Sequence, residues 1–128
     1  ETIKLLINKN MFATSTKILV LGITFKENCP DVRNTKVVDI YNELIQFGIN
    51  VDVYDPWADA NEVKHEYGLT LAAEIGTGYD AIVLAVAHHP YTAFTEEYLL
   101  SIANEKAMFA DLKGIYRNKI SKLKYWSL

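Results

Sequence analysis

An unbroken apolar run, Ile18-Leu19-Val20-Leu21, between Lys17 and Gly22, constrains the fold of this chain more than any other feature. The run lacks the alternation of apolar and polar residues that marks a strand with one wet face, which favours a strand buried in a parallel sheet. The segment Ala81-Ile82-Val83-Leu84-Ala85-Val86 has the same character. Because neighbouring parallel strands need a crossover connection, helices are expected between the strands and on both faces of the sheet.

The segments around these two runs supply the expected crossovers. Apolar residues recur at helical spacing from Val37 to Ile45, and Gly48 ends this predicted helix. Asn34 or Thr35 is its expected N-cap. The other predicted elements are a strand at 50–56, a short helix at 59–67, a fragment at 71–75, a helix at 95–103, a strand at 107–111 and a short strand at 124–126. This order predicts an α/β fold, a Rossmann-like three-layer αβα sandwich with a mainly parallel sheet.

Composition limits the possible partners. The chain has 128 residues, half of them hydrophobic, which is enough for the core of one domain. Its 13 basic and 16 acidic residues form no basic stripe, so nucleic acid is not a predicted partner. No apolar stretch approaches the roughly 20 residues of a bilayer span, so no membrane partner is predicted either. A single cysteine, Cys29, cannot form a disulfide within the chain, and a reducing cytoplasm is the expected compartment.

Four loops leave the carboxyl ends of the predicted strands, at the edge where open parallel sheets bind their ligands. They cover residues 22–35, 55–59, 87–91 and 111–116. The first loop holds two cations, Lys26 and Arg33, and an ammonium and a planar guanidinium both suit phosphate groups. These residues are therefore candidates for binding an anion, and solvated surface charges are the alternative.

A dinucleotide-binding fingerprint is missing from the first loop. It would need Gly-x-Gly-x-x-Gly directly after the strand, and only Gly22 is present. The acid at the end of the second strand, Asp55, lies beyond the usual spacing of about 20 residues. The chain is therefore not predicted to be a main NAD-binding unit.

Other residues of the four loops allow both a functional and a structural interpretation. Phe25 could cover a sugar or a base, although burial against the sheet is the favoured interpretation. Asp31 is expected to order the loop, through a contact with Arg33. Lys113 either adds a third positive charge to the edge of the sheet or is a turn lysine.

Neither a metal site nor a catalytic residue is predicted. His88 and His89 are adjacent, so their side chains point different ways, and no Cys or Glu stands at a supporting spacing. Cys29 is followed at once by Pro30 and belongs to no visible triad, so it is interpreted as a non-catalytic thiol.

Four segments follow one another in order along the chain: Gly22-Ile23-Thr24-Phe25-Lys26, Asp31-Val32-Arg33-Asn34-Thr35, Val51-Asp52-Val53-Tyr54-Asp55-Pro56 and Asp111-Leu112-Lys113-Gly114. Together they resemble the C-terminal domain of the UDP-glucose/GDP-mannose dehydrogenase family, from about Thr16 onward. The fuller run from Phe25 to Thr35, with Ala85-Val86-Ala87-His88, is most similar to the branch that oxidises UDP-N-acetylhexosamines for bacterial surface polysaccharides.

The resemblance implies an activity and a set of site residues. Members oxidise the C6 hydroxyl of a UDP-sugar to a carboxylate in two NAD-dependent steps, through a thiohemiacetal on a cysteine whose motif this chain lacks. Phe25 and Lys26 would contact the UDP-sugar, and Arg33 would approach NAD. Lys113 aligns with a substrate-binding arginine, but Leu112-Lys113 replaces Gly-Arg here, so a bidentate contact is lost.

The resemblance also implies that the chain is a piece of a longer protein. Residues 1–15 would end a connecting helix and linker from a central region, and residues 16–128 would form the C-terminal-like domain. An ordinary N-terminal helix without its starting methionine is the alternative. The parent would be a homodimer that binds NAD mainly through its N-terminal domain, and this piece alone would be inactive and monomeric.

Two rival functions are compatible with an α/β fold. One is a non-catalytic module for subunit assembly, in which the charges of the loops are merely solvated. The other is a receiver-type signalling domain, which needs an acidic cluster around a metal at the strand ends. The first loop instead begins with Phe25-Lys26, which argues against a receiver-type domain.

Overall fold

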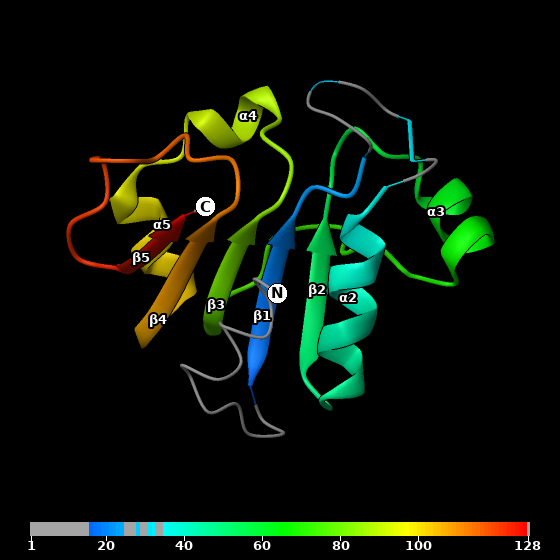
Figure 1. Ribbon diagram of the computed structural model, residues 1–128, viewed down its shortest axis with the longest axis horizontal. Helices are drawn as coiled ribbons and strands as arrows, with labels where there is room; N and C mark the ends of the chain where they lie inside the picture. The colour runs from blue at the N-terminus through cyan, green and yellow to red at the C-terminus, as the bar shows by residue number, and fades with distance from the viewer. Residues whose placement is uncertain (1–15, 25–27, 29–30, 33–34, 128) are drawn as a thin grey trace.

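A five-stranded parallel sheet forms the centre of the protein in a computed structural model that describes residues 16–24, 28, 31–32 and 35–127. The strands stand in the order β2-β1-β3-β4-β5, and every neighbouring pair is parallel (Figure 1). Their bounds are β1 Lys17–Leu21, β2 Asn50–Tyr54, β3 Tyr79–Leu84, β4 Ala103–Asp111 and β5 Lys124–Ser127. The helices are α2 Val37–Gln46, α3 Ala60–Tyr67, α4 His89–Thr92 and α5 Glu96–Ile102. The predicted α/β class is confirmed.

Alternate residues of the strands face two separate apolar layers, as expected for a sheet covered on both sides. Ile18 and Val20 of β1 pack with α2 and α3, while Leu19 and Leu21 pack with α4 and α5. All four side chains are almost fully buried. The uninterrupted apolar run in the sequence therefore reflects burial on both faces of a central strand.

The structure differs from the sequence-based prediction at several places, and β3, expected at 81–86, runs from Tyr79 to Leu84. β4 begins at Ala103, four residues earlier than predicted. Residues 104–106 of this strand are polar and exposed, so no apolar pattern marks them as part of a strand. The four-residue helix α4 was missed, since one turn has no apolar periodicity. Residues 71–75 form neither helix nor strand. Lys36 occupies the N-cap position of α2 without a side-chain cap, although the hydroxyl of Thr35 accepts from the N–H of Val37 at 3.2 Å.

Residues 1–15, predicted to be a helix end and linker, lie outside the described residues, so that assignment stays a prediction. Among the residues that the structure describes, no helix has the length and apolar character needed to cross a membrane.

Gly22 ends β1 in a backbone conformation that a side chain would not tolerate. Its φ is +97°, and an added Cβ would lie 2.6 Å from Cβ of Val86. Substitution of Gly22 by alanine is expected to lower the free energy of unfolding by about 2 to 4 kcal/mol, from backbone strain and a clash in a packed region. Denaturant unfolding measures this loss.

Gly48→Ala is the matched control for Gly22→Ala. Gly48 also has a positive φ, +76°, but nothing lies within 4 Å of an added Cβ there. The control should therefore lose only the backbone contribution, about 1 to 2 kcal/mol. Equal losses in the two variants would show that the approach to Val86 is unimportant.

Candidate functional site

The candidate site lies at the carboxyl edge of the sheet, between the loops that follow β1 and β3. The chain passes from β1 through α2 to β2 on one side, and β3 lies on the other side of β1, so the direction of winding reverses between β1 and β3. In open α/β sheets this switch point is the usual place of a ligand. The loops after β1, β2 and β3 meet there.

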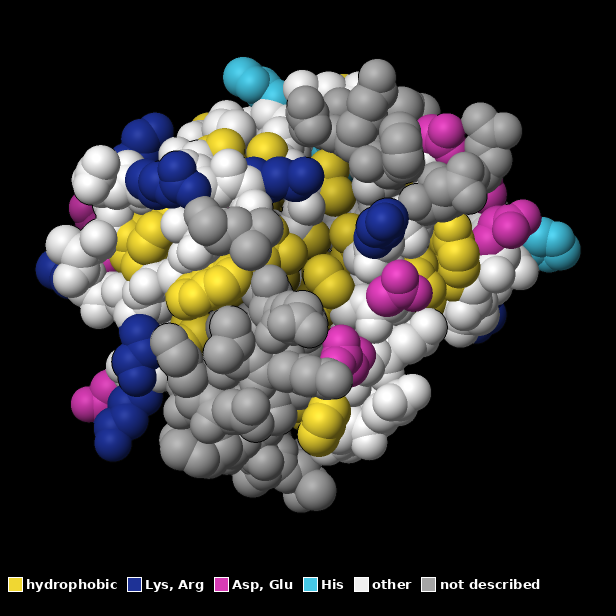
Figure 2. Space-filling model, in the orientation of Figure 1, with side chains coloured by type: hydrophobic (Ala, Val, Ile, Leu, Met, Phe, Trp, Pro, Cys, Tyr) yellow, Lys and Arg dark blue, Asp and Glu magenta, His cyan; other side chains and the backbone are white. Residues whose placement is uncertain are grey.

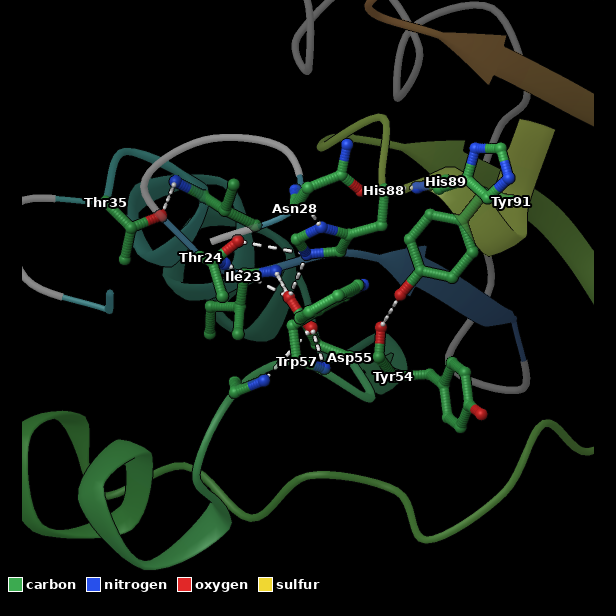
Figure 3. Close-up of polar contacts among 12 residues, drawn as sticks. Ile23, Thr24, Asn28, Thr35, Tyr54, Asp55, Trp57, His88, His89 and Tyr91 are labelled. Carbon is green, nitrogen blue, oxygen red and sulfur yellow. Dashed lines mark hydrogen bonds and ion pairs between the residues drawn. The ribbon is translucent and has the colours of Figure 1, made fainter. Parts of the chain in front are cut away.

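The carboxylate of Asp55, at the end of β2, holds these loops together (Figure 3). Its Oδ2 accepts from the N–H of Ile23 at 2.7 Å and of Thr24 at 3.1 Å, both in the loop after β1. Its Oδ1 accepts from the N–H of Trp57 at 2.8 Å and of Ala58 at 3.2 Å, in its own loop. The carboxylate therefore satisfies four backbone donors, and both of its oxygens are engaged.

Asp55 is buried but ionised. Burial by itself raises the pKa of the Asp55 carboxyl, but hydrogen bonds from His88, Ile23 and Trp57, with the attraction of the His88 ring, outweigh it and hold the pKa below its ordinary value of 3.8. An anion that accepts this many hydrogen bonds is stable at neutral pH.

His88 connects the segment after β3 to the same cluster. The side chain is fully buried, and its Nε2 lies 3.0 Å from Oδ2 of Asp55 and 3.0 Å from Oγ1 of Thr24. On the other side of the ring, Nδ1 accepts from the backbone N–H of Asn28 at 2.9 Å. Since Nδ1 accepts, the ring proton is assigned to Nε2, which points at the carboxylate.

Aromatic side chains surround His88. The ring of Tyr91, in α4, lies 5.5 Å from the His88 ring, and its hydroxyl donates to the carbonyl of Tyr54 at 2.9 Å. The ring of Trp57 lies 5.9 Å from His88, and 40% of this residue is exposed. Trp57 therefore presents an apolar ring to solvent at the edge of a polar cluster.

The fourth loop, which follows β4, is fixed by a second buried carboxylate. Asp111 accepts from the N–H of Gly114 at 2.8 Å and of Tyr116 at 2.7 Å, and from the hydroxyl of Tyr125 at 2.6 Å. The hydroxyl of Tyr116 in turn donates to the carbonyl of Tyr91. The loop after β4 is thus joined to α4 and, through it, to the surroundings of His88.

The residues predicted for the site are only partly covered by the structure. Phe25, Lys26 and Arg33 lie outside the described residues, as does Cys29. Lys113 is described, and it is exposed at the same edge, in the loop after β4, which is separated from β1 by β3. The roles predicted for these residues remain predictions.

The described neighbours of the predicted cations are nevertheless held firmly at the edge of the sheet. Thr24 and Asn28 stand on either side of residues 25–27, and both contact His88. Val32 precedes Arg33, is fully buried, and its carbonyl accepts from the hydroxyl of Tyr67 in α3.

Sequence reasoning missed the roles of Asp55 and His88. From the sequence, the only roles considered for these side chains are binding of a dinucleotide ribose for Asp55 and metal binding for His88. Among the described residues there is no group of three or more His, Cys, Asp or Glu side chains that could hold a metal ion. Their positions in the sequence could have indicated these roles. A carboxylate and an imidazole that directly follow buried strands are expected to be buried, and buried polar groups need hydrogen-bond partners.

Apart from Lys113, the basic residues near the C-terminal end are a second omission. Six of the chain's thirteen basic residues are Lys106, Lys113, Arg117, Lys119, Lys122 and Lys124. In Figure 2 most Lys and Arg side chains lie on the side of β4 and β5, and most acidic ones on the side of β2 and α3. Arg117 and Lys119 belong to the loop after β4 and are exposed, so they add to the positive charge near Lys113.

Comparison of the sequence and fold with known proteins identifies the family of this chain. Residues 19–118 match the UDP-glucose/GDP-mannose dehydrogenase family, UDP binding domain. The chain belongs to the UDP-glucose/GDP-mannose dehydrogenase family. The matched residues begin within β1 and include β2, β3, β4 and all four loops at the carboxyl edge. The resemblance seen in the sequence is confirmed.

Among curated relatives, this family member is 40% identical over 116 residues to UDP-N-acetyl-D-glucosamine 6-dehydrogenase of Salmonella typhi, covering 90% of this chain and 27% of the relative. It is 39% identical over 125 residues to the enzyme of the same name from Pseudomonas aeruginosa, covering 97% of this chain and 30% of the relative. The chain therefore spans less than a third of the length of these relatives.

A solved structure with the same fold is NDP-N-acetyl-D-galactosaminuronic acid dehydrogenase from Methanosarcina mazei Go1. It superposes with a TM-score of 0.80 at 18% identity, covering 98% of this chain and 27% of the solved chain. This likeness supports the Rossmann-like, three-layer architecture of the family member.

Proposed function

We propose that this chain is the UDP-sugar-binding part of a longer NAD-dependent UDP-sugar 6-dehydrogenase. The observation that carries the proposal is the fixed edge of the sheet. Loops from three strands are tied together at the switch point by Asp55 and His88, within the residues that match a UDP binding domain. This is the place where such a sheet binds a ligand.

Positive charge at this edge suits a diphosphate. Lys26, between Thr24 and Asn28 in the sequence, is proposed to contact the pyrophosphate, and Phe25 to cover the nucleotide or sugar. Lys113 is proposed to add a single charge-assisted contact from the loop after β4. A lysine there supplies a point charge in place of a bidentate guanidinium contact.

NAD is proposed to be bound mainly outside this chain. The acid that would hold the ribose hydroxyls in a dinucleotide-binding domain corresponds in position to Asp55, and both of its carboxylate oxygens are already engaged by the protein. The residues described here therefore do not fit a full NAD site. Arg33 is proposed to approach the cofactor from this side.

The substrate we propose is a UDP-N-acetylhexosamine, with UDP-N-acetylglucosamine as the first choice. Two relatives near 40% identity carry the name UDP-N-acetyl-D-glucosamine 6-dehydrogenase. The product, a uronic acid nucleotide, would serve surface polysaccharide synthesis, and the cytoplasm is the proposed compartment. The longer protein is proposed to be a homodimer, while the chain alone, without a catalytic cysteine motif, should be inactive.

Calorimetric titration of UDP into the full-length protein tests this proposal. Saturable binding is expected, and NAD should still bind to a protein already saturated with UDP, because the proposed sites are separate. Absence of UDP binding would contradict the proposal and would favour the assembly module instead.

A further inference from the structure

Asn28 makes an unusual pair of contacts with the segment that follows β3 (Figure 3). Its backbone N–H donates to Nδ1 of His88 at 2.9 Å, and its side-chain Oδ1 accepts from the N–H of His89 at 2.8 Å. Its φ is 58°, a left-handed conformation that asparagine adopts more readily than most residues. The loop after β1 is thus held at Asn28 by both backbone and side chain.

The other side of the His88 ring is fixed independently. Its Nε2 contacts Asp55 and Thr24, each at 3.0 Å, and the ring lies beside Tyr91. The side chain has no exposed surface, so it is a buried polar group with both nitrogens engaged. Nε2 joins the segment after β3 to Asp55 and to Thr24 at the start of the loop after β1, and Nδ1 contacts Asn28 farther along that loop.

We propose that His88 is a positioning residue for nucleoside diphosphate binding, and that Nδ1 does this by fixing Asn28 at the switch point. The inference rests on the proposed function. The two nitrogens have different roles: Nε2 stabilises the fold through Asp55 and Thr24, at the start of the loop after β1, and Nδ1 sets the position of that loop farther along, at Asn28. The pair His88-His89 thus acts through its contacts with Asn28.

Two substitutions separate the nitrogens. In His88→Asn the side-chain oxygen can take the place of Nδ1, but the side chain is too short to replace Nε2. In His88→Gln the longer amide can donate to Asp55 in place of Nε2, but no acceptor remains at the position of Nδ1. His88→Gln therefore removes the contact of Nδ1 with Asn28, whereas His88→Asn removes the contacts of Nε2 with Asp55 and Thr24.

The test uses the full-length protein with UDP as the probe. For His88→Gln we expect the Kd for UDP to rise about three- to tenfold, as for loss of one hydrogen bond. Hydrogen exchange in the peptide that contains Asn28 should become faster, while the denaturation midpoint stays near that of the unaltered protein. For His88→Asn the pattern should reverse, with a Kd within about twofold of the unaltered value and a lower midpoint.

The outcomes distinguish this inference from the proposed function. UDP binding by the unaltered protein with equal Kd values in both variants would overturn the positioning role alone. Losses of affinity and stability that run in parallel in both variants would also overturn it, because they would show a purely structural role. Absence of UDP binding by the unaltered protein would overturn the proposed function and the positioning role together.

Discussion

Replacing Asp55 by asparagine is expected to lower the free energy of unfolding by about 3 to 5 kcal/mol, the cost of breaking a buried charged network. The two side chains have nearly the same shape, so no cavity forms. The new amide nitrogen must face either Ile23, Thr24 and His88 or Trp57 and Ala58, all of which donate hydrogen bonds to the carboxylate. At least two backbone donors would lose their acceptor. Denaturant unfolding followed by circular dichroism measures the loss.

Asp59→Asn is the matched control for Asp55→Asn. Asp59 also accepts two backbone hydrogen bonds, from Asn61 at 2.9 Å and Glu62 at 3.0 Å, but it is an exposed helix N-cap. Because asparagine caps a helix about as well as aspartate, the control should stay within about 0.5 kcal/mol of the unaltered protein. A similar loss in both variants would contradict the special role of Asp55.

The effect of Asp55→Asn should depend on pH. The pKa of Asp55 in the folded protein lies below the ordinary value of 3.8, so the carboxylate stabilises the fold fully above about pH 4. This stabilisation is lost as the pH falls through the folded-state pKa, where the carboxyl becomes protonated. The difference in stability between the two proteins should therefore be constant near neutrality and shrink in acid.

Replacing Lys26 by alanine in the full-length protein is expected to raise the Kd for a UDP-sugar about ten- to a hundredfold. A charge-assisted contact to phosphate contributes about 1.5 to 3 kcal/mol, and this range corresponds to the expected change in Kd. The Kd for NAD should change little, because Lys26 is assigned to the substrate. Calorimetric titration of each ligand measures both values.

Lys64→Ala provides the control for Lys26→Ala. Lys64 is an exposed lysine of α3 whose ammonium donates a hydrogen bond to the hydroxyl of Thr70 at 3.0 Å. The substitution Lys64→Ala removes the same charge as Lys26→Ala, but from a different part of the surface. Its substitution should leave the Kd for the UDP-sugar unchanged. Equal Kd values for Lys26→Ala and the unaltered protein would remove Lys26 from the site.

The sheet could be predicted from the sequence because its signal is local. The runs 18–21 and 81–86, which supply most of β1 and β3, are apolar without interruption, and burial on both faces of a central parallel strand requires that pattern. The start of β4 could not be predicted in the same way. Residues 104–106 are exposed, so nothing in their polarity separates them from a loop.

The candidate site could be predicted only in outline. Charge in the loop after β1 pointed to anion binding, because Lys26 and Arg33 stand out within a short segment. The network that organises the loop joins residues far apart in the chain: Asn28 and His88 are separated by 60 positions, and His88 and Asp55 by 33. Such pairings depend on strand order, which no local pattern encodes.

The most direct test of the central claim is the formation of NADH by the full-length protein when it is given NAD and UDP-N-acetylglucosamine. We expect NADH to form only when both are present, with two molecules of NADH for each sugar, because oxidation of an alcohol to a carboxylate removes four electrons and NAD accepts two. The Lys26→Ala variant should need a higher sugar concentration for the same rate. Absence of NADH with this sugar and with other UDP-sugars, from a protein that is folded and binds NAD, would contradict the account.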